Sequence, residues 1–285
     1  MLQKTITDMN KDDPNIEYIQ NYFFEVYKIK YPIYGYISLG YFNAFKSLDS
    51  LNTEQKTQVK TWLVNLFNTS SIVAGDFNTI PKNISDLLKE LSISADILST
   101  PSYLFPKEDV SDPVYIPSFD NFVIFDTAIE KTNLKPLIKL PEKLNINPRK
   151  YMHKISSPSD HVPVIGSFTK QNRQVSIGVY NVADPVFWGD RYPSAKVGFD
   201  TTGVGEKKRT SELTHYINQL INECDLVFLS EVPSEYSISI NDLAVKNNKQ
   251  TQIKEMAHID RDSKGNQFIT APLLGVSNNI LIFRS

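Results

Sequence analysis

Apolar runs alternate with amphipathic segments along most of the chain, and they predict a repeated order of strand, helix and strand. Runs rich in Val, Ile and aromatic residues are typical of strands. The expected strands are 33–41, 71–80, 119–125, 175–182, 225–232 and 279–284, with another at the end of 157–168. Apolar residues at helical spacing predict helices capped at Thr53, over 83–91 and over 206–223. Two sheets with helices outside them would bury these runs, so an α/β fold is expected.

Polar side chains stand where these strands end. In the stretch 71–81 an apolar run reaches Gly75, and Asp76 and Asn78 follow two residues apart. Residues two apart in a strand point to the same side, so these two could face a ligand together. A strand followed by an Asx-rich turn explains the stretch alone equally well. The other strand ends supply Tyr41, Asp120, Asp160, His161, Asn181 and Glu231.

Carboxylates and carboxamides dominate this set, with one phenol and one imidazole. Hard oxygen ligands suit Mg²⁺ or Mn²⁺ and not zinc. One acid could activate a water while His161 donates to a phosphoryl oxygen, which fits hydrolysis of a phosphoester. Each residue also has an ordinary explanation, since Glu231 could end a strand in solvent and His161 could lie on a surface turn. The pattern therefore favours a metal-assisted hydrolase only when the set is taken together.

Composition limits the remaining choices. The 285 residues carry a net charge of −2, so a nucleic-acid contact would need a local basic patch or a metal-bridged phosphate. The one cysteine, Cys224, excludes a disulfide framework and is expected to be buried. The polar start lacks the apolar core of a signal peptide, and no apolar run is long enough to span a bilayer. A soluble, intracellular protein is expected.

Several motifs resemble those of the endonuclease/exonuclease/phosphatase superfamily. Gly75-Asp76-Phe77-Asn78 and Ser159-Asp160-His161-Val162-Pro163 look like its late motifs, and Phe119-Asp120-Asn121-Phe122-Val123 resembles the strand before the last one. Tyr180-Asn181-Val182 and Leu229-Ser230-Glu231-Val232 resemble the two early motifs, with Ser230 in place of the usual Gln. Tyr41 falls where members carry His or Tyr. The motifs around 75–81 and 158–164 look more like the deadenylase and nocturnin branch, whereas Tyr41 resembles the apurinic-site endonuclease branch.

The order of these motifs is rotated relative to the family. The late motifs come first in the chain and the early motifs follow. This order indicates one circularly permuted domain over 1–285, in which 1–168 is the family's C-terminal half, 169–174 a linker and 175–285 the N-terminal half. The alternative is a site completed by exchange of halves between two chains. A monomer is favoured.

The resemblance implies a DNase I-like, four-layered α/β sandwich of two packed mixed sheets flanked by helices. It also implies an Mg²⁺- or Mn²⁺-dependent phosphodiesterase acting on nucleic acid, with RNA favoured. By resemblance the catalytic residues are Asp76, Asn78, His161, Asp120 and Tyr41, the metal ligands Glu231, Asn181 and Asp160, and the substrate-binding residues Asn43 and Arg191. The alternatives are hydrolysis of inositol phosphates or lipid phosphoesters, and a non-catalytic binding module that keeps the fold.

Overall fold

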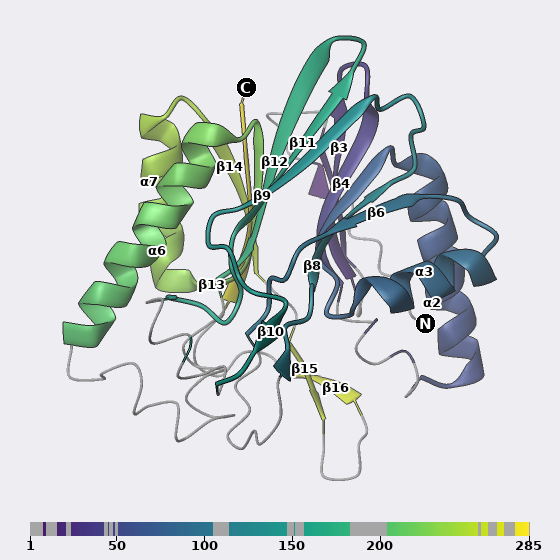
Figure 1. The fold of residues 1–285 in the computed structure, drawn as a ribbon, viewed down its shortest axis with the longest axis horizontal. Helices are drawn as coiled ribbons and strands as arrows, with labels where there is room; N and C mark the ends of the chain where they lie inside the picture. The colour runs from purple at the N-terminus through teal and green to yellow at the C-terminus, as the bar shows by residue number, and fades with distance from the viewer. Residues whose placement is uncertain are drawn as a thin grey trace.

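Two β-sheets lie face to face in the centre of the protein, and helices cover their outer sides, as a computed structural model shows (Figure 1). The structure describes residues 8–9, 16–20, 24–42, 45, 48, 51–104, 114–146, 151, 157–182, 204–255, 258–261, 267–270 and 277–284.

The first sheet comes entirely from the first half of the chain. Its strands lie in the order β1 (Asp8–Met9), β2 (Ile16–Gln20), β3 (Phe24–Tyr31), β4 (Gly35–Phe42), β5 (Ile72–Asp76), β8 (Asp120–Ile124) and β6 (Asp96–Ser99). The β4–β5 pair is parallel and the other neighbours are antiparallel, so the sheet is mixed. The strand expected over 71–80 ends at Asp76, before Asn78.

The second sheet combines both halves of the chain. Its strands lie in the order β14 (Gln250–Glu255), β17 (Ser277–Phe283), β13 (Leu226–Pro233), β12 (Arg173–Asn181), β11 (Val164–Lys170) and β9 (Lys131–Pro136). Here β12 and β13 form the parallel pair. Two small two-stranded sheets lie apart from the main sheets, one formed by β7 (Val114–Tyr115) with β10 (Lys143–Leu144) and the other by β15 (His258–Arg261) with β16 (Gln267–Thr270).

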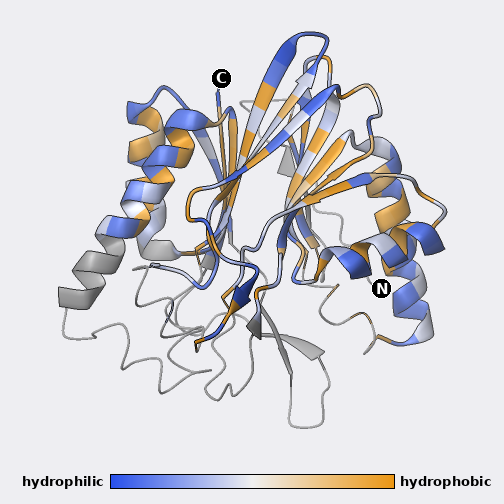
Figure 2. Ribbon diagram, viewed as in Figure 1, coloured by the Kyte–Doolittle hydropathy of each residue, from blue (hydrophilic) through white to orange (hydrophobic). Residues whose placement is uncertain are grey.

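Apolar clusters fill the three spaces between four layers. One cluster lies between the sheets, and the others join each sheet to its helices. The helices are α2 (Thr53–Thr69) and α3 (Pro81–Glu90) on the first sheet, and α6 (Val204–Glu223) and α7 (Ser234–Lys246) on the second. In Figure 2 the apolar colours lie where the helices face the sheets. The predicted four-layered α/β sandwich is confirmed.

Local details of the helices differ little from the sequence expectation. Helix α2 starts where expected, but its N-cap is Asn52, which exchanges hydrogen bonds with Gln55 in a capping box, and not Thr53. Cys224 is buried directly after α6, as expected. In the part of the chain that the structure describes, no helix is long and apolar enough to cross a membrane.

Each sheet contains one strand–helix–strand unit with parallel strands. These units are β4–α2–β5 in the first sheet and β12–α6–β13 in the second. Parallel neighbours end at the same edge of a sheet, and the two units bring their strand ends to a common edge of the sandwich. Tyr41, Asp76, Asn181 and Glu231 lie at or near these ends.

The segment expected as a linker, 169–174, is the tip of a β-hairpin. Strands β11 and β12 are in register from Val164↔Val179 to Lys170↔Arg173, which leaves only Gln171 and Asn172 as the turn. Both turn residues have positive φ, 51° and 57°, as a two-residue type I′ turn requires. The hairpin reaches the top of Figure 1.

Gly75 lets β5 approach β4 closely just before the strand ends. Gly40 and Gly75 are register partners, and Gly75 has a φ of 140°. A Cβ on Gly75 would lie 1.8 Å from the carbonyl oxygen of Gly40. Because each glycine directly precedes a predicted site residue, this contact sets the spacing between Tyr41 and Asp76.

The substitution Gly75→Ala should lower the free energy of unfolding by at least about 3 kcal/mol, since overpacking and a strained φ each cost on the order of 1–3 kcal/mol. Urea unfolding measures the loss. The control is Gly178→Ala, where the nearest atoms are side-chain atoms of Cys224 and Leu220 at 3.0 Å, which can shift. Equal losses in the two variants would contradict the close approach.

Candidate active site

A row of ionisable and polar side chains crosses the first sheet at its edge. The register pairs Glu25 with Tyr41, Tyr41 with Asp76, and Asp76 with Asp120. Residues two positions along these strands, among them Tyr27, Leu39 and Phe122, belong to the cluster between the sheets. Side chains alternate along a strand, so this row also faces the second sheet. All four of its residues are buried.

A second row, on the other sheet, faces the first. Asn181 on β12 is the register partner of Ser230 on β13. The pairing of β13 with β17 shifts between Leu229 and Val232, so Ser230 and Glu231 together lie opposite Asn279 in a β-bulge. Asn181, Ser230 and Asn279 are buried, and Glu231 is half-buried. The candidate site is the space in which these two rows meet.

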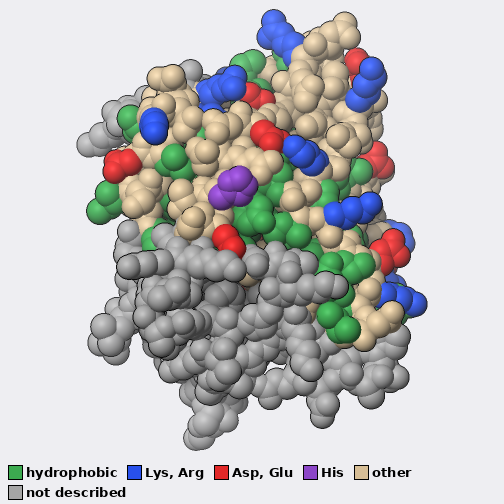
Figure 3. Space-filling view, turned by 60° about the vertical axis from the view of Figure 1, so that its left-hand side comes forward, with side chains coloured by type: hydrophobic (Ala, Val, Ile, Leu, Met, Phe, Trp, Pro, Cys, Tyr) green, Lys and Arg blue, Asp and Glu red, His purple; other side chains and the backbone are tan. Residues whose placement is uncertain are grey.

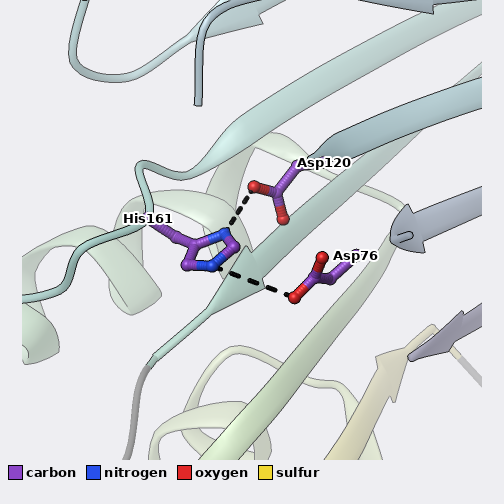
Figure 4. A group of neighbouring side chains, drawn as sticks. All are labelled: Asp76, Asp120 and His161. Atoms are coloured by element: carbon purple, nitrogen blue, oxygen red, sulfur yellow. Dashed lines mark hydrogen bonds and ion pairs between the residues drawn. The ribbon is translucent and has the colours of Figure 1, made fainter. Parts of the chain in front are cut away.

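His161 joins the rows and lies between two carboxylates (Figure 4). Its Nδ1 is 2.8 Å from Oδ2 of Asp120, and its Nε2 is 3.9 Å from Oδ2 of Asp76. The same oxygen of Asp76 accepts a hydrogen bond of 2.9 Å from the Asn181 amide. The Nε2 distance exceeds that of a hydrogen bond. Therefore Asp120 orients the ring, and the Nε2 proton remains available to a further acceptor.

Serine side chains hold the segment that carries His161. Ser159 donates to the Asn181 carbonyl at 2.9 Å and accepts the His161 backbone N–H at 3.1 Å. Ser102 accepts the Asp120 backbone N–H at 3.0 Å and so fixes the end of β8. The Tyr103 ring lies 4.7 Å from the His161 ring. These contacts tie His161 to both sheets.

Tyr41 and Glu231 connect the two sheets on the other side of Asp76. The Tyr41 hydroxyl donates to Oε1 of Glu231 at 2.6 Å. Glu231 has a φ of 53°, in the left-handed region, because it occupies the bulge. A strained backbone that surrounding contacts hold in place is typical of functional sites.

The charges of the site produce a protonated imidazole. Burial opposes a charged His161, but the carboxylates of Asp120 and Asp76 outweigh it and raise its pKa to about 10. His161 is therefore an imidazolium at neutral pH. Burial raises the pKa of Asp76 to about 7, against the opposing effect of His161, and the charge of Asp120 adds to the rise. Asp76 thus changes protonation near neutral pH.

The groups around Glu231 respond to its negative charge. Burial raises the pKa of Asp160 to about 6; His161 opposes this rise, and Glu231 adds to it. Burial, followed by the charges of Glu231 and Asp76, raises the pKa of Tyr41 well above its ordinary value, so the phenol stays protonated as a donor. Two acids whose charges repel one another are a place where a bound cation would be stabilised.

The donor chemistry fits a hard divalent cation better at Glu231 and Asp160 than at His161. One oxygen each of Asp76 and Asp120 and one ring nitrogen of His161 lie within 4.8 Å of one another. However, the protonated imidazole has no lone pair for a metal, and its Nδ1 is already bonded to Asp120. Glu231 and Asp160 offer carboxylate oxygens, which suit Mg²⁺ or Mn²⁺.

The structure brings most of the predicted residues together. Tyr41, Asp76, Asp120, His161 and Asn181 line the meeting rows, and Glu231 and Asp160 adjoin them. Asn78 lies just beyond the strand with a φ of 49°, where its side chain still adjoins the Tyr41 hydroxyl, and its backbone N–H donates to Oδ1 of Asp76 at 2.8 Å. It forms an Asx turn that holds Asp76. Asn43 and Arg191 lie outside the described residues.

Sequence reasoning missed Glu25, Asn279, Ser102 and Tyr103. One signal was present for Glu25, which alternates with the apolar residues Tyr27 and Ile29 and so stands on the inner face of β3. Asn279 opens a run of apolar residues in β17. Ser102 and Tyr103 lie in an irregular segment without periodicity.

Solved structures with a similar fold include enzymes that process nucleic acid. A D. rerio TDP2 complexed with a single-strand DNA product has 11% identity and a TM-score of 0.41, and the match covers 85% of this chain and 81% of that one. An endonuclease/exonuclease/phosphatase family protein from Leptotrichia buccalis C-1013-b has 10% identity and a TM-score of 0.38, covering 81% and 83%. No protein-family model matches the chain, and no curated protein matches it. At these values the likeness supports no statement about activity or substrate.

The stability contributed by His161 should depend on pH. The imidazole has a pKa of about 10 in the folded protein against 6.5 ordinarily, so its contribution is complete below pH 6.5 and is lost as the pH rises towards 10. In the presence of a chelator, the destabilisation by His161→Gln should be larger at about pH 6 than at about pH 10, by about 1 kcal/mol or more. Urea unfolding at both pH values measures it. His215→Gln, at an exposed position of α6, is the control, and an equal pH effect there would contradict the assignment.

Proposed function

We propose that the chain is a divalent-metal-dependent phosphodiesterase that hydrolyses nucleic acid, with single-stranded RNA as the favoured substrate and Mg²⁺ or Mn²⁺ as the cation. The observation that carries this proposal is the placement of His161, whose Nδ1 lies 2.8 Å from Oδ2 of Asp120 while its Nε2 points towards Asp76 at 3.9 Å, without a hydrogen bond to it. A positively charged donor next to a carboxylate that titrates near neutral pH suits the attack of water on a phosphoester.

Each of the described site residues would have a separate role in hydrolysis. Asp76, held by Asn181 and the Asn78 N–H, would accept the proton of the attacking water. His161 would donate from Nε2 to a phosphoryl oxygen, whose charge grows as the bond from water to phosphorus forms and the bond to the leaving oxygen breaks. Glu231 and Asp160 would hold the cation, with Tyr41 fixing Glu231. When bound, the cation would neutralise charge on the phosphate.

Recognition of the substrate would rest on this site more than on a broad basic surface. The net charge is −2, and on the described part of the face in Figure 3 Lys and Arg side chains lie scattered among acidic ones. A scattered distribution offers no continuous track for a phosphate backbone.

Hydrolysis should depend on Asp76 and His161. Asp76→Asn and His161→Gln should each lower kcat at least about 100-fold, because each removes a proton-transfer or charge-stabilising group. The assay follows cleavage of labelled single-stranded RNA, duplex DNA and an inositol phosphate in the presence of Mg²⁺.

Exposed residues supply the controls for this assay. Asp86→Asn changes an acid paired with Lys82 on the surface of α3, and His215→Gln changes an exposed imidazole, so both should keep full activity. A chelator should abolish cleavage and Mn²⁺ should restore it.

If the protein cleaves none of the three substrates, the enzyme proposal fails and a non-catalytic binding module becomes the better hypothesis. Cleavage of the inositol phosphate alone would move the substrate class to phosphoesters outside nucleic acid.

We also propose that the chain is a single circularly permuted domain, with 1–168 as the family's C-terminal half and 175–285 as its N-terminal half. Two contacts within one chain support this reading, the hydrogen bonds from Asn181 to Asp76 and from Tyr41 to Glu231. The two-residue turn at Gln171–Asn172 joins the halves as neighbouring strands of one sheet.

A fully active monomer is expected, because the residues of the site meet within one chain. Light scattering coupled to gel filtration gives the mass, and the same fractions are assayed for hydrolysis. Mixing Asp76→Asn with Glu231→Gln protein provides the control, since exchange of halves between two chains would restore one intact site. Activity regained on mixing, or activity confined to a dimer, would support exchange and contradict the monomer.

A further inference from the structure

A buried carboxylate on β3, Glu25, lies next to the site without belonging to the residues given a chemical role above. It is 5% exposed, between Phe24 and Val26, which face the helices. Its register partner is Tyr41, so the two side chains stand side by side on the inner face of the first sheet. A carboxylate is costly to bury unless hydrogen bonds or an opposite charge compensate it.

One partner of Glu25 is Asn279, on the second sheet. The Asn279 amide donates to Oε2 of Glu25, and the Tyr27 hydroxyl donates to the Asn279 carbonyl at 3.0 Å. Strand β3 therefore contacts Asn279 at two points. Glu25 accepts a hydrogen bond from the side chain of Asn279, and Tyr27 donates one to its backbone carbonyl. Among the described residues, Oδ1 of Asn279 has no hydrogen-bond partner. The bond to Glu25 thus gives this amide its orientation.

Asn279 occupies the place opposite the bulge that carries Glu231. The register of β13 with β17 passes from Leu229↔Ile280 to Val232↔Asn278, which leaves Asn279 facing Ser230 and Glu231. Glu231 keeps its φ of 53° only while this local pairing persists. Tyr41, beside Glu25, holds the side chain of the same Glu231. The β3–β4 hairpin thus holds the bulge at two points, through Asn279 and through Glu231.

We propose that Glu25 is a positioning residue, which acts through Asn279 to fix the bulge and so to place the Glu231 carboxylate for a divalent cation. This inference rests on the proposed function, in which Glu231 holds that cation. Residues that orient a metal ligand without touching the metal commonly change metal affinity by about 10- to 100-fold.

The test uses the full chain and measures Mn²⁺ binding by calorimetry. Glu25→Ala and Asn279→Ala should each weaken Mn²⁺ binding by about tenfold or more. Because both remove the same bond, the double variant should bind no more weakly than the weaker single variant. Glu25→Gln keeps an oxygen that accepts from Asn279, so it should bind within about threefold of the wild type. If Glu25→Ala fails to fold, Asn279→Ala still removes the bond.

The control is Ser38→Ala, which removes a buried hydrogen bond to Ser70 in the same sheet, away from the site. It should leave Mn²⁺ affinity unchanged even if it lowers stability. Hydrogen exchange provides a second readout, since the amides of 226–233 should exchange faster in Glu25→Ala and Asn279→Ala but not in Ser38→Ala.

The outcomes separate this inference from the proposed function. A wild-type protein that binds Mn²⁺ while Glu25→Ala and Asn279→Ala bind it equally well overturns the positioning role alone. A Glu25→Gln variant as weak as Glu25→Ala also overturns it, because charge and not orientation would then explain the loss. A wild-type protein that binds no Mn²⁺ overturns both the metal-dependent function and the role of Glu25 in it.

Discussion

The site depends on one interaction, the contact of the His161 imidazolium with Asp120 and, at a longer distance, with Asp76. Two buried carboxylates in adjacent register positions would repel each other, and neither could be hydrated. The imidazolium offsets the charge of Asp120, which is 2.8 Å from its Nδ1, and partly offsets the charge of Asp76, which is 3.9 Å from its Nε2. Burial still makes Asp76 hold its proton more tightly than an exposed acid, with a pKa of about 7, although His161 acts in the opposite direction. A structural ion pair gains nothing from such a value, whereas a general base working near neutral pH needs it.

Strain on the second sheet has a comparable explanation. A non-glycine residue in the left-handed region costs roughly 1–2 kcal/mol. A hydrogen bond to a charged group contributes about 1.5–3 kcal/mol, so the Tyr41–Glu231 bond alone can offset the strain at Glu231. The bulge turns Glu231 out of the strand's alternation, while Ser230 keeps the inward position beside Asn181. Each sheet therefore fixes a polar group of the other: Tyr41 of the first sheet holds Glu231, and Asn181 of the second sheet holds Asp76.

Much of this could be predicted from the sequence, for reasons visible at particular residues. The apolar run before Asp76 and the run before Glu231 are buried on both sides, so their ends were recognisable. The region of β2 and β3 was not recognisable as strands, because aromatic and charged residues mix there and neither the helical nor the strand periodicity stands out. Glu25 looked like one charge among several. The turn at Gln171–Asn172 lacks the glycine that usually marks such a hairpin, which made the segment resemble a linker. The strand expected through Asn78 ends at Asp76, because a strand end and an Asx turn have the same sequence pattern.

Chain order matters less to this site than strand register does. The row from Glu25 to Asp120 is fixed by which residues pair across β3, β4, β5 and β8, and the facing row by pairing across β12, β13 and β17. Pairing places the groups at the same edge whichever half of the chain is synthesised first. The turn between β11 and β12 lies at the end of these two strands that is far from the site. The register runs from Val164↔Val179 to Lys170↔Arg173, so a connection at the turn leaves the site untouched. A rotated motif order is then compatible with an intact constellation, provided that the connection keeps Asn181 opposite Ser230 and Asp76 opposite Asp120. A slip of one residue in either pair would turn these side chains to the helix side and dismantle the site.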